Sequence, residues 1–85
     1  MQYVVLIGAR ARRDMAALPA DILRRVDVRI RELAANPRPP GCKKLKARTP
    51  EAWRIRVGDH RVLYTINDAA REVFVLRVGH RSDVY

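Results

Sequence analysis

The chain has only one cysteine, Cys42, among its 85 residues, so an intramolecular disulfide is excluded. No apolar run approaches the ~20 residues that a membrane-spanning helix needs. The short apolar run near the N-terminus does not resemble a secretory signal either, because the positive charges follow it instead of preceding it. These absences predict a cytoplasmic protein that uses neither disulfides nor a membrane.

Histidine is also scarce: His60 and His80 are the only two, and they stand far apart in the sequence. Neither has cysteine or acidic residues at the spacing that a zinc site requires. We therefore expect no metal and no other cofactor. Aromatic residues are few as well, so Trp53 and Tyr64 are expected to serve packing.

Acidic residues number 9 against 18 basic ones, which gives a net charge of +9. A field this unbalanced opposes a compact state and favours a polyanionic partner, which could be nucleic acid, an acidic protein or an anionic membrane surface. The ordinary alternative is a set of scattered, solvated charges. Hydrophobic residues make up 48% of the chain, which is enough for one core. We therefore predict a single domain spanning residues 1–85.

Hydrophobic periodicity predicts the order β-α-α-β-β-β. Ile22, Val26 and Ile30 recur at helical spacing, and Asn36-Pro37 ends that pattern. The predicted strands are 2–8, 52–57, 60–66 and 73–79, the predicted helices are 9–18 and 20–35, and 42–52 is a basic connector with a few extended residues. Short connections make the last three strands antiparallel neighbours. The expected fold is α+β, with two helices on one face of a small, mainly antiparallel sheet.

The stretch "WRIRVGDHRVLY" predicts a hairpin with a two-residue turn at Gly58-Asp59, of type II′. That turn sets Arg56 directly opposite Arg61, and like charges in this position destabilise a sheet. No acidic residue occupies a facing position in these strands. Guanidinium groups bind phosphate through two parallel hydrogen bonds, so a phosphodiester is the simplest group that would offset the repulsion.

Strict alternation along the strands sorts the side chains into two faces. The face away from the helices should have an apolar floor of Leu63, Val73 and Val75. Basic residues should surround this floor: Arg54, Arg56, Arg61, Arg77 and Arg81, with Lys43, Lys44 and Lys46 along one edge. Phe74, Leu76 and Val78 should face the helices, together with Trp53, Ile55, Val57, Val62, Tyr64 and Ile66.

The stretch "GCKKLKARTPEAWRIRVGDHRVLYTIND" and the later "VLRVGHRSDVY" resemble the RelE branch of the RelE/ParE toxin superfamily. The resemblance covers nearly the whole chain. Its most specific parts are G-x-K-K-L, W/Y-R-I-R, G-D-x-R-V-x-Y and V-G-H-R-x-x-V-Y. It implies two helices on a small antiparallel sheet, and it implies the toxin of a type II toxin–antitoxin system.

The resemblance also implies a metal-independent endoribonuclease that enters the ribosomal A site and cuts mRNA by attack of a 2′-OH. Arg61 and Arg81 would stabilise transition-state charge, Arg54 and Arg56 would position the RNA backbone and share that task, and Tyr85 would stack on or orient the RNA. His80 is a candidate general base. Lys43, Lys44, Lys46 and Arg77 would contact phosphates. An acidic antitoxin would bind the toxin in a hetero-oligomer and inhibit it.

Two other functions stay open at this point. The first is inhibition of DNA gyrase by a ParE-like toxin, since the same fold would serve it. The second is RNA binding without turnover. Relatives often have lysines where this chain has Arg54 and Arg56, and arginine hardly acts as a base.

Overall fold

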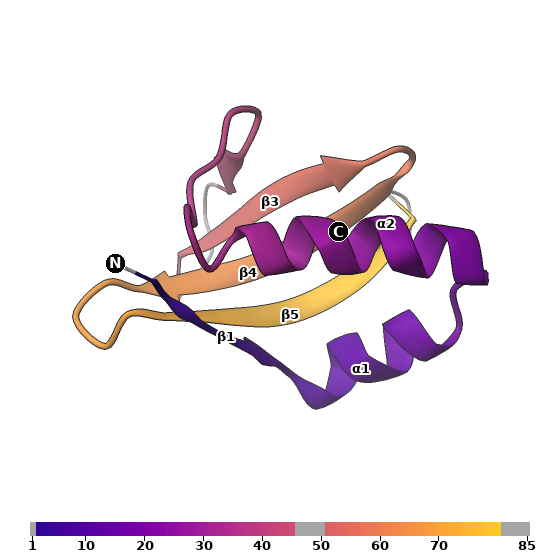
Figure 1. Ribbon diagram of the computed structural model, residues 1–85, viewed down its shortest axis with the longest axis horizontal. Helices are drawn as coiled ribbons and strands as arrows, with labels where there is room; N and C mark the ends of the chain where they lie inside the picture. The colour runs from indigo at the N-terminus through magenta and orange to yellow at the C-terminus, as the bar shows by residue number, and fades with distance from the viewer. Residues whose placement is uncertain (1, 46–50, 81–85) are drawn as a thin grey trace.

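The structure is a computed structural model that describes residues 2–45 and 51–80. A strand and two helices come first: β1 (Val4–Ile7), α1 (Ala9–Ala16) and α2 (Ala20–Glu32). Four strands follow: β2 (Lys43–Leu45), β3 (Ala52–Val57), β4 (His60–Asn67) and β5 (Glu72–His80). Figure 1 shows α2 in front of the sheet and α1 beside the end of β1. The predicted order of elements is confirmed, and the connector contributes the short strand β2.

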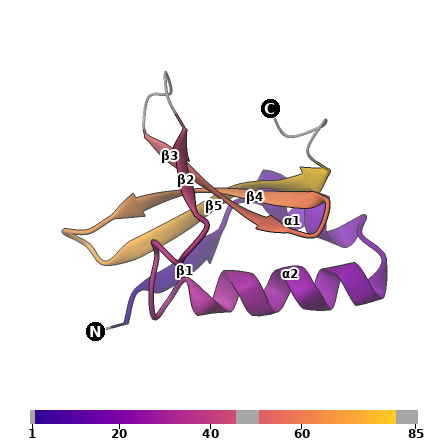
Figure 2. The ribbon, with the colours of Figure 1, turned by 90° about the horizontal axis from the view of Figure 1, so that it is seen from above.

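The strands form one mixed sheet in the order β1-β5-β4-β3-β2. β1 runs parallel to β5, and the other three pairs are antiparallel. Figure 2 shows α2 lying along one side of this sheet. Ala11 of α1 belongs to the same buried cluster as Val26 and Ile30 of α2, so both helices cover the same face. The α+β prediction is therefore confirmed. Neither helix in the described part of the chain has the length and apolar character needed to cross a bilayer.

The core lies between the helices and this face of the sheet. The helical stripe buries Val26, Ile30 and Leu33, as the spacing in the sequence predicted. The sheet contributes side chains that alternate along the strands, and these are Ile55, Val57, Val62, Tyr64, Val73, Val75 and Val78. Burial of this set provides the main favourable free energy of folding.

A β-bulge in β5 overturns part of the predicted sorting. Leu63 pairs with Arg77 and Tyr64 pairs with Val75, so Leu76 is an additional residue in β5. The alternation is therefore reversed on the N-terminal side of the bulge. Val73 and Val75 are fully buried in the helix-side core, and the predicted apolar floor loses both.

Phe74 lies on the face opposite to the predicted one. Strict alternation placed it in the core, but its side chain is 41% exposed. It pairs with Leu6 of β1, which is also 41% exposed. The bulge therefore leaves apolar side chains on the outer face of the β1–β5 pair.

The β3–β4 hairpin has the predicted register. Val57 pairs with His60, Arg56 with Arg61, and Arg54 with Leu63. Of the two turn residues only Gly58 has a positive φ, of 60°, as a type II′ turn requires. Glycine adopts this conformation without the steric cost that a Cβ would add.

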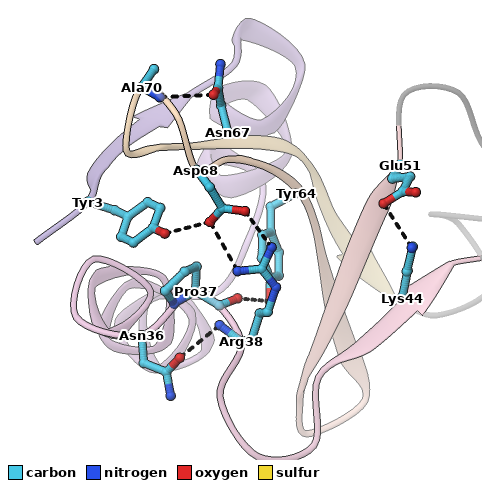
Figure 3. A network of polar contacts seen from close by, with 10 residues as sticks. All are labelled: Tyr3, Asn36, Pro37, Arg38, Lys44, Glu51, Tyr64, Asn67, Asp68 and Ala70. Atoms are coloured by element: carbon cyan, nitrogen blue, oxygen red, sulfur yellow. Dashed lines mark hydrogen bonds and ion pairs between the residues drawn. The ribbon is translucent and has the colours of Figure 1, made fainter. Parts of the chain in front are cut away.

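A network of polar contacts joins distant parts of the chain at the β4–β5 turn (Figure 3). Asp68 accepts a hydrogen bond from the Tyr3 hydroxyl at 2.6 Å and two from Arg38, at 2.9 and 3.2 Å. The guanidinium carbon of Arg38 also lies 5.1 Å from the centre of the Trp53 ring. One carboxylate therefore connects β1, the proline-rich loop and the sheet.

A buried bond ties the same loop to the core. The Tyr64 hydroxyl donates to the Pro37 carbonyl at 2.7 Å. Burial raises the pKa of Tyr64 well above its ordinary value, so the phenol stays protonated and keeps its role as a donor. Pro37, Pro39 and Pro40 have no backbone N–H to donate, and this bond fixes the loop after α2 against the sheet.

Tyr64→Phe is expected to lower the free energy of unfolding by about 1–2 kcal/mol, because it leaves the Pro37 carbonyl without its donor. Tyr3→Phe removes a hydroxyl that bonds to Asp68 in an exposed position, and it should cost less. Denaturant unfolding of both variants measures the difference. Equal losses of unfolding free energy in the two variants would show that the buried hydrogen bond stabilises the fold no more than the exposed one.

The acid dependence of stability should report on Asp68. The bonds from Arg38 and Tyr3 hold the pKa of Asp68 at about 2, below its ordinary value. A depressed carboxyl pKa contributes stability above the ordinary value of ~3.9. That contribution is lost as the pH falls through about 2. Wild type should therefore be more stable than Asp68→Asn at neutral pH. This difference, measured by thermal unfolding, should narrow as the pH falls to about 2. A difference independent of pH would contradict this assignment.

Candidate functional site

Two adjacent rows of paired residues gather basic side chains on the sheet face away from the helices. One row runs from Lys43 through Arg54 and Leu63 to Arg77, and the next runs from Arg56 through Arg61 to Gly79. Directly paired residues share a face, and so do residues two apart on one strand. Lys43, Arg54, Arg56 and Arg61 therefore lie on one surface, as predicted. We call this set the arginine face.

Arg54 is the unusual member of the arginine face. It is only 7% exposed, although arginine is seldom buried without a partner. Its buried Nε has no hydrogen-bond partner among the residues that the structure describes. Leu63, its neighbour on β4, is fully buried. A buried donor without an acceptor costs stability, which makes Arg54 a candidate binding residue.

Arg56 and Arg61 face each other across the hairpin, and neither strand places a carboxylate in register with them. Arg56 is exposed and Arg61 is half-buried. The main chain of Arg56 is held from the helix side, because Arg29 of α2 donates a hydrogen bond to the Arg56 carbonyl at 3.1 Å. The pair therefore sits on fixed backbone in the middle of the face.

Arg77 pairs with Leu63 and so continues the first row on this face, but its charge is already bound by an acid of α1. Its Nε lies 2.9 Å from Asp14 Oδ2 of α1, and the Val78 amide donates to the same oxygen at 3.0 Å. Burial alone would raise the pKa of Asp14, but the bonds from Arg77 and Val78 outweigh it, and the pKa lies below its ordinary value. The aspartate thus neutralises Arg77 beside the helix. Sequence spacing gave no signal of this contact between distant residues.

His80 also lies away from the arginine face. It pairs with His60, in the row that continues from the core residue Val57, so both histidines are on the helix side. Their rings meet edge to face with centroids 5.9 Å apart. β5 runs through Gly79 to His80, so the alternation from the core residue Val78 continues to His80.

The lysines divide between the two sides of the edge strand β2. Lys43 pairs with Arg54, whereas Lys44 pairs with Trp53 and forms an ion pair with Glu51 at 3.0 Å (Figure 3). Lys44 is therefore already partly neutralised. Three predicted residues lie outside the described residues, and these are Lys46, Arg81 and Tyr85.

The chemistry available on this face is anion binding. Arginine remains protonated in proteins and offers a planar set of donors that matches phosphate. Within residues 2–45 and 51–80, no three histidine, cysteine, aspartate or glutamate side chains gather closely enough to hold a metal ion. Lys43, Arg54, Arg56 and Arg61 can thus hold a polyanion on a rigid sheet.

Comparison with known proteins agrees with this geometry. The model of the family described as the ParE toxin of type II toxin–antitoxin systems, parDE, matches residues 5–85. Toxin RelG of Mycobacterium tuberculosis is 37% identical over 86 residues, and the alignment covers 100% of this chain and 98% of RelG.

Solved structures show the same relationship. A chain of the toxin–antitoxin complex RelBE2 from Mycobacterium tuberculosis superposes with a TM-score of 0.85 at 34% identity, covering 98% of this chain and 95% of that one. For the archaeal RelE–RelB complex of Pyrococcus horikoshii the TM-score is 0.83 at 26% identity, covering 99% and 100%. The chain therefore belongs to the RelE/ParE superfamily of type II toxin–antitoxin toxins and groups with its RelE branch.

Proposed function

We propose that this toxin is a metal-independent endoribonuclease that cuts mRNA in the ribosomal A site. One observation carries the proposal: Arg54, Arg56 and Arg61 lie together on the sheet face away from the helices, and Arg54 keeps a buried donor without an acceptor among the described residues. A scaffold that served packing alone would gain from replacing such a group by an apolar side chain.

The reaction begins with attack of a 2′-oxygen on the adjacent phosphorus. The O2′–P bond forms, the P–O5′ bond breaks, the 2′-hydroxyl loses its proton and the departing 5′-oxygen gains one. The products are a 2′,3′-cyclic phosphate and a free 5′-hydroxyl. Negative charge accumulates on the phosphorane, and fixed guanidinium donors stabilise it without reorganising.

The residues divide this work by position. Arg61 lies at the centre of the paired rows and is assigned to the phosphorane, together with Arg81. Arg54 and Arg56 hold the RNA backbone and share the charge, and Lys43 extends the contact along β2. Tyr85 stacks on or orients the RNA, since aromatic rings support unstacked bases.

His80 has no part in proton transfer in this proposal, because it lies on the helix side with His60. The protein's main contribution is thus positioning and charge stabilisation. Preorganised charge stabilisation is usually the largest single part of enzymatic rate enhancement, so a site of arginines is compatible with turnover.

The relatives also suggest how the activity is restrained. Two of the similar structures are complexes of a toxin with a RelB antitoxin. We propose that a cognate antitoxin binds this chain in a hetero-oligomer in the cytoplasm. The net charge of +9 favours an acidic segment over the arginine face.

A second candidate function is inhibition of DNA gyrase, which the ParE description of the matching family favours. The shared fold does not separate the two functions. A toxin that blocks supercoiling by gyrase and leaves mRNA intact would support gyrase inhibition. The arginine face favours the nuclease.

Arg61→Ala is expected to reduce mRNA cleavage by about a hundredfold, as the loss of one transition-state donor does in other enzymes. The measurement is a translation reaction with a labelled mRNA, followed by mapping of the cut ends relative to codon boundaries. Arg24→Ala removes the same charge from the exposed surface of α2 and serves as the control. Cleavage that survives in Arg61→Ala would refute the site. If the wild-type protein bound RNA without cutting it, the proposed nuclease activity would be contradicted.

Arg54→Met tests whether the buried guanidinium is kept for function. Methionine has a similar length and needs no acceptor, so the free energy of unfolding should rise by about 1 kcal/mol or at least not fall. Cleavage should nevertheless decrease at least tenfold, roughly the loss of one charged hydrogen bond. Arg24→Met is the matched control and should change neither quantity. A destabilised Arg54→Met would mean that Arg54 supports the fold.

A further inference from the structure

A groove opens between α2 and the turn that joins β3 to β4. Its volume is about 370 Å³. The residues that line it are Arg24, Arg25, Val28, Arg29, Val57 and Gly58. It lies on the helix side of the hairpin, where Val57 belongs to the core cluster. No role assigned above to RNA binding or cleavage uses this groove.

The floor of the groove is apolar. Val28 of α2 is 54% exposed, and Val57 at the end of β3 lines the groove with it. The other large apolar side chains that the described residues expose are Val4, Leu6 and Phe74, which belong to β1 and β5. Val28 is thus the helical member of this exposed set. A single exposed valine is ordinary on a protein surface, so the charges around it decide what the groove can bind.

Three arginines of α2 surround the floor, and no acidic residue is among the lining residues. Arg29 is already engaged, because it donates to the Arg56 carbonyl at 3.1 Å and lies 3.4 Å from Glu32. Arg25 is exposed, and among the described residues it has neither a hydrogen bond nor an ion pair. Its guanidinium lies over the turn, since a Cβ at Gly58 would be 3.3 Å from Arg25 Nη2. An unpaired cation therefore stands at the edge of an apolar floor.

The spacing along α2 indicates the shape of a matching ligand. Arg25, Val28 and Arg29 stand at i, i+3 and i+4, so they form one stripe on the helix surface. A partner helix with glutamates at i and i+4 and an apolar residue at i+3 presents the same stripe with the opposite charge. A guanidinium has five N–H donors, so Arg29 can serve a carboxylate while it keeps its bond to the hairpin.

We propose that this groove binds an acidic helix of a protein partner, whose apolar side chain packs on Val28 and Val57 while a carboxylate pairs with Arg25. The cognate antitoxin proposed above is a partner of this chemistry, so the inference rests on that part of the proposed function. It adds a second contact surface, on the side of the hairpin opposite to the arginine face. A partner bound here gains affinity without occupying the arginine face.

The observations favour a protein over two other occupants. No aromatic residue is among the lining residues, so the groove offers no platform for a nucleic-acid base, and a phosphate would leave Val28 uncovered. A second copy of this chain has a net charge of +9 and would bring like charge to a basic rim. An acidic segment with an apolar residue satisfies both the floor and the rim.

The test measures binding of a fluorescent helical peptide to the full chain by anisotropy. The peptide has the sequence Glu-Ala-Ala-Leu-Glu within a helix of alanine and glutamine. A second peptide has alanine in place of the leucine, and a third has glutamine in place of both glutamates. The protein variants are Val28→Ser and Arg25→Gln. Arg71→Gln removes one charge at the β4–β5 turn, at the opposite end of the sheet, and is the control.

All three positions are exposed, so each variant should unfold at the temperature of wild type. If Val28→Ser loses stability, Val28→Ala takes its place in the binding measurements.

Val28→Ser should weaken binding of the first peptide about tenfold, because the apolar contact is lost. Arg25→Gln should weaken it about fivefold, near the upper limit for an exposed ion pair. Arg71→Gln should bind it as wild type does. The decisive measurement is a double-mutant cycle. Replacing the peptide leucine should cost about tenfold with wild type and little more with Val28→Ser, and the glutamine peptide should be insensitive to Arg25→Gln.

Three results would overturn the proposal. The first is no saturable binding of the first peptide to wild type, or strictly additive losses in the cycles. The second is equal weakening by Arg25→Gln and Arg71→Gln, which would reduce the effect to net charge. The third is binding of short 2′-O-methylated RNA that depends on Val28 and Arg25, which would assign the groove to nucleic acid.

Failure of the proposed nuclease looks different from failure of the groove. An mRNA that wild type leaves uncut on the ribosome refutes the nuclease. Coupling between Val28 and the peptide leucine still supports the groove in that case, because the peptide measurement involves no RNA.

Discussion

The register of one hairpin determines both sides of the sheet. The turn at Gly58-Asp59 sets Val57 against His60, and every later pair of β3 and β4 follows from it. A slip of one residue would turn Arg54 and Arg56 into the core and expose Ile55 and Val57. Because one face is buried under two helices, such a slip would forfeit most of the core. The apolar packing on one face therefore holds the like charges together on the other.

Two aspartates bind basic side chains from distant segments. Asp14 of α1 neutralises Arg77, and Asp68 of the β4–β5 turn binds both Arg38 and Tyr3. These pairs join segments that are far apart in the sequence and so stabilise the fold. On the arginine face no carboxylate pairs in register with Arg54, Arg56 or Arg61. Among the described residues, these two aspartates thus serve contacts between distant segments of the fold.

Local chemistry explains which parts could be predicted from the sequence. The turn residues fix the hairpin register, so the Arg56–Arg61 pair and the position of Arg54 followed from a few neighbouring residues. The placement of Val73, Val75 and Phe74 was wrong, because the bulge at Leu76 arises from pairing with β4 and leaves no mark in the β5 sequence. The ion pair of Arg77 could not be predicted, because its partner Asp14 lies in another element.

The pairing of β1 with β5 has a consequence for how the molecule is made. β1 is the first strand of the chain, yet in the described sheet its only neighbour is the last one. A nascent chain leaves the ribosome from its N-terminus, so β1 can pair within the sheet only after β5 has been synthesised. Gly79, which completes the row of Arg56 and Arg61, arrives with that same strand. The row of Arg56 and Arg61 is therefore completed only after β5 has been synthesised.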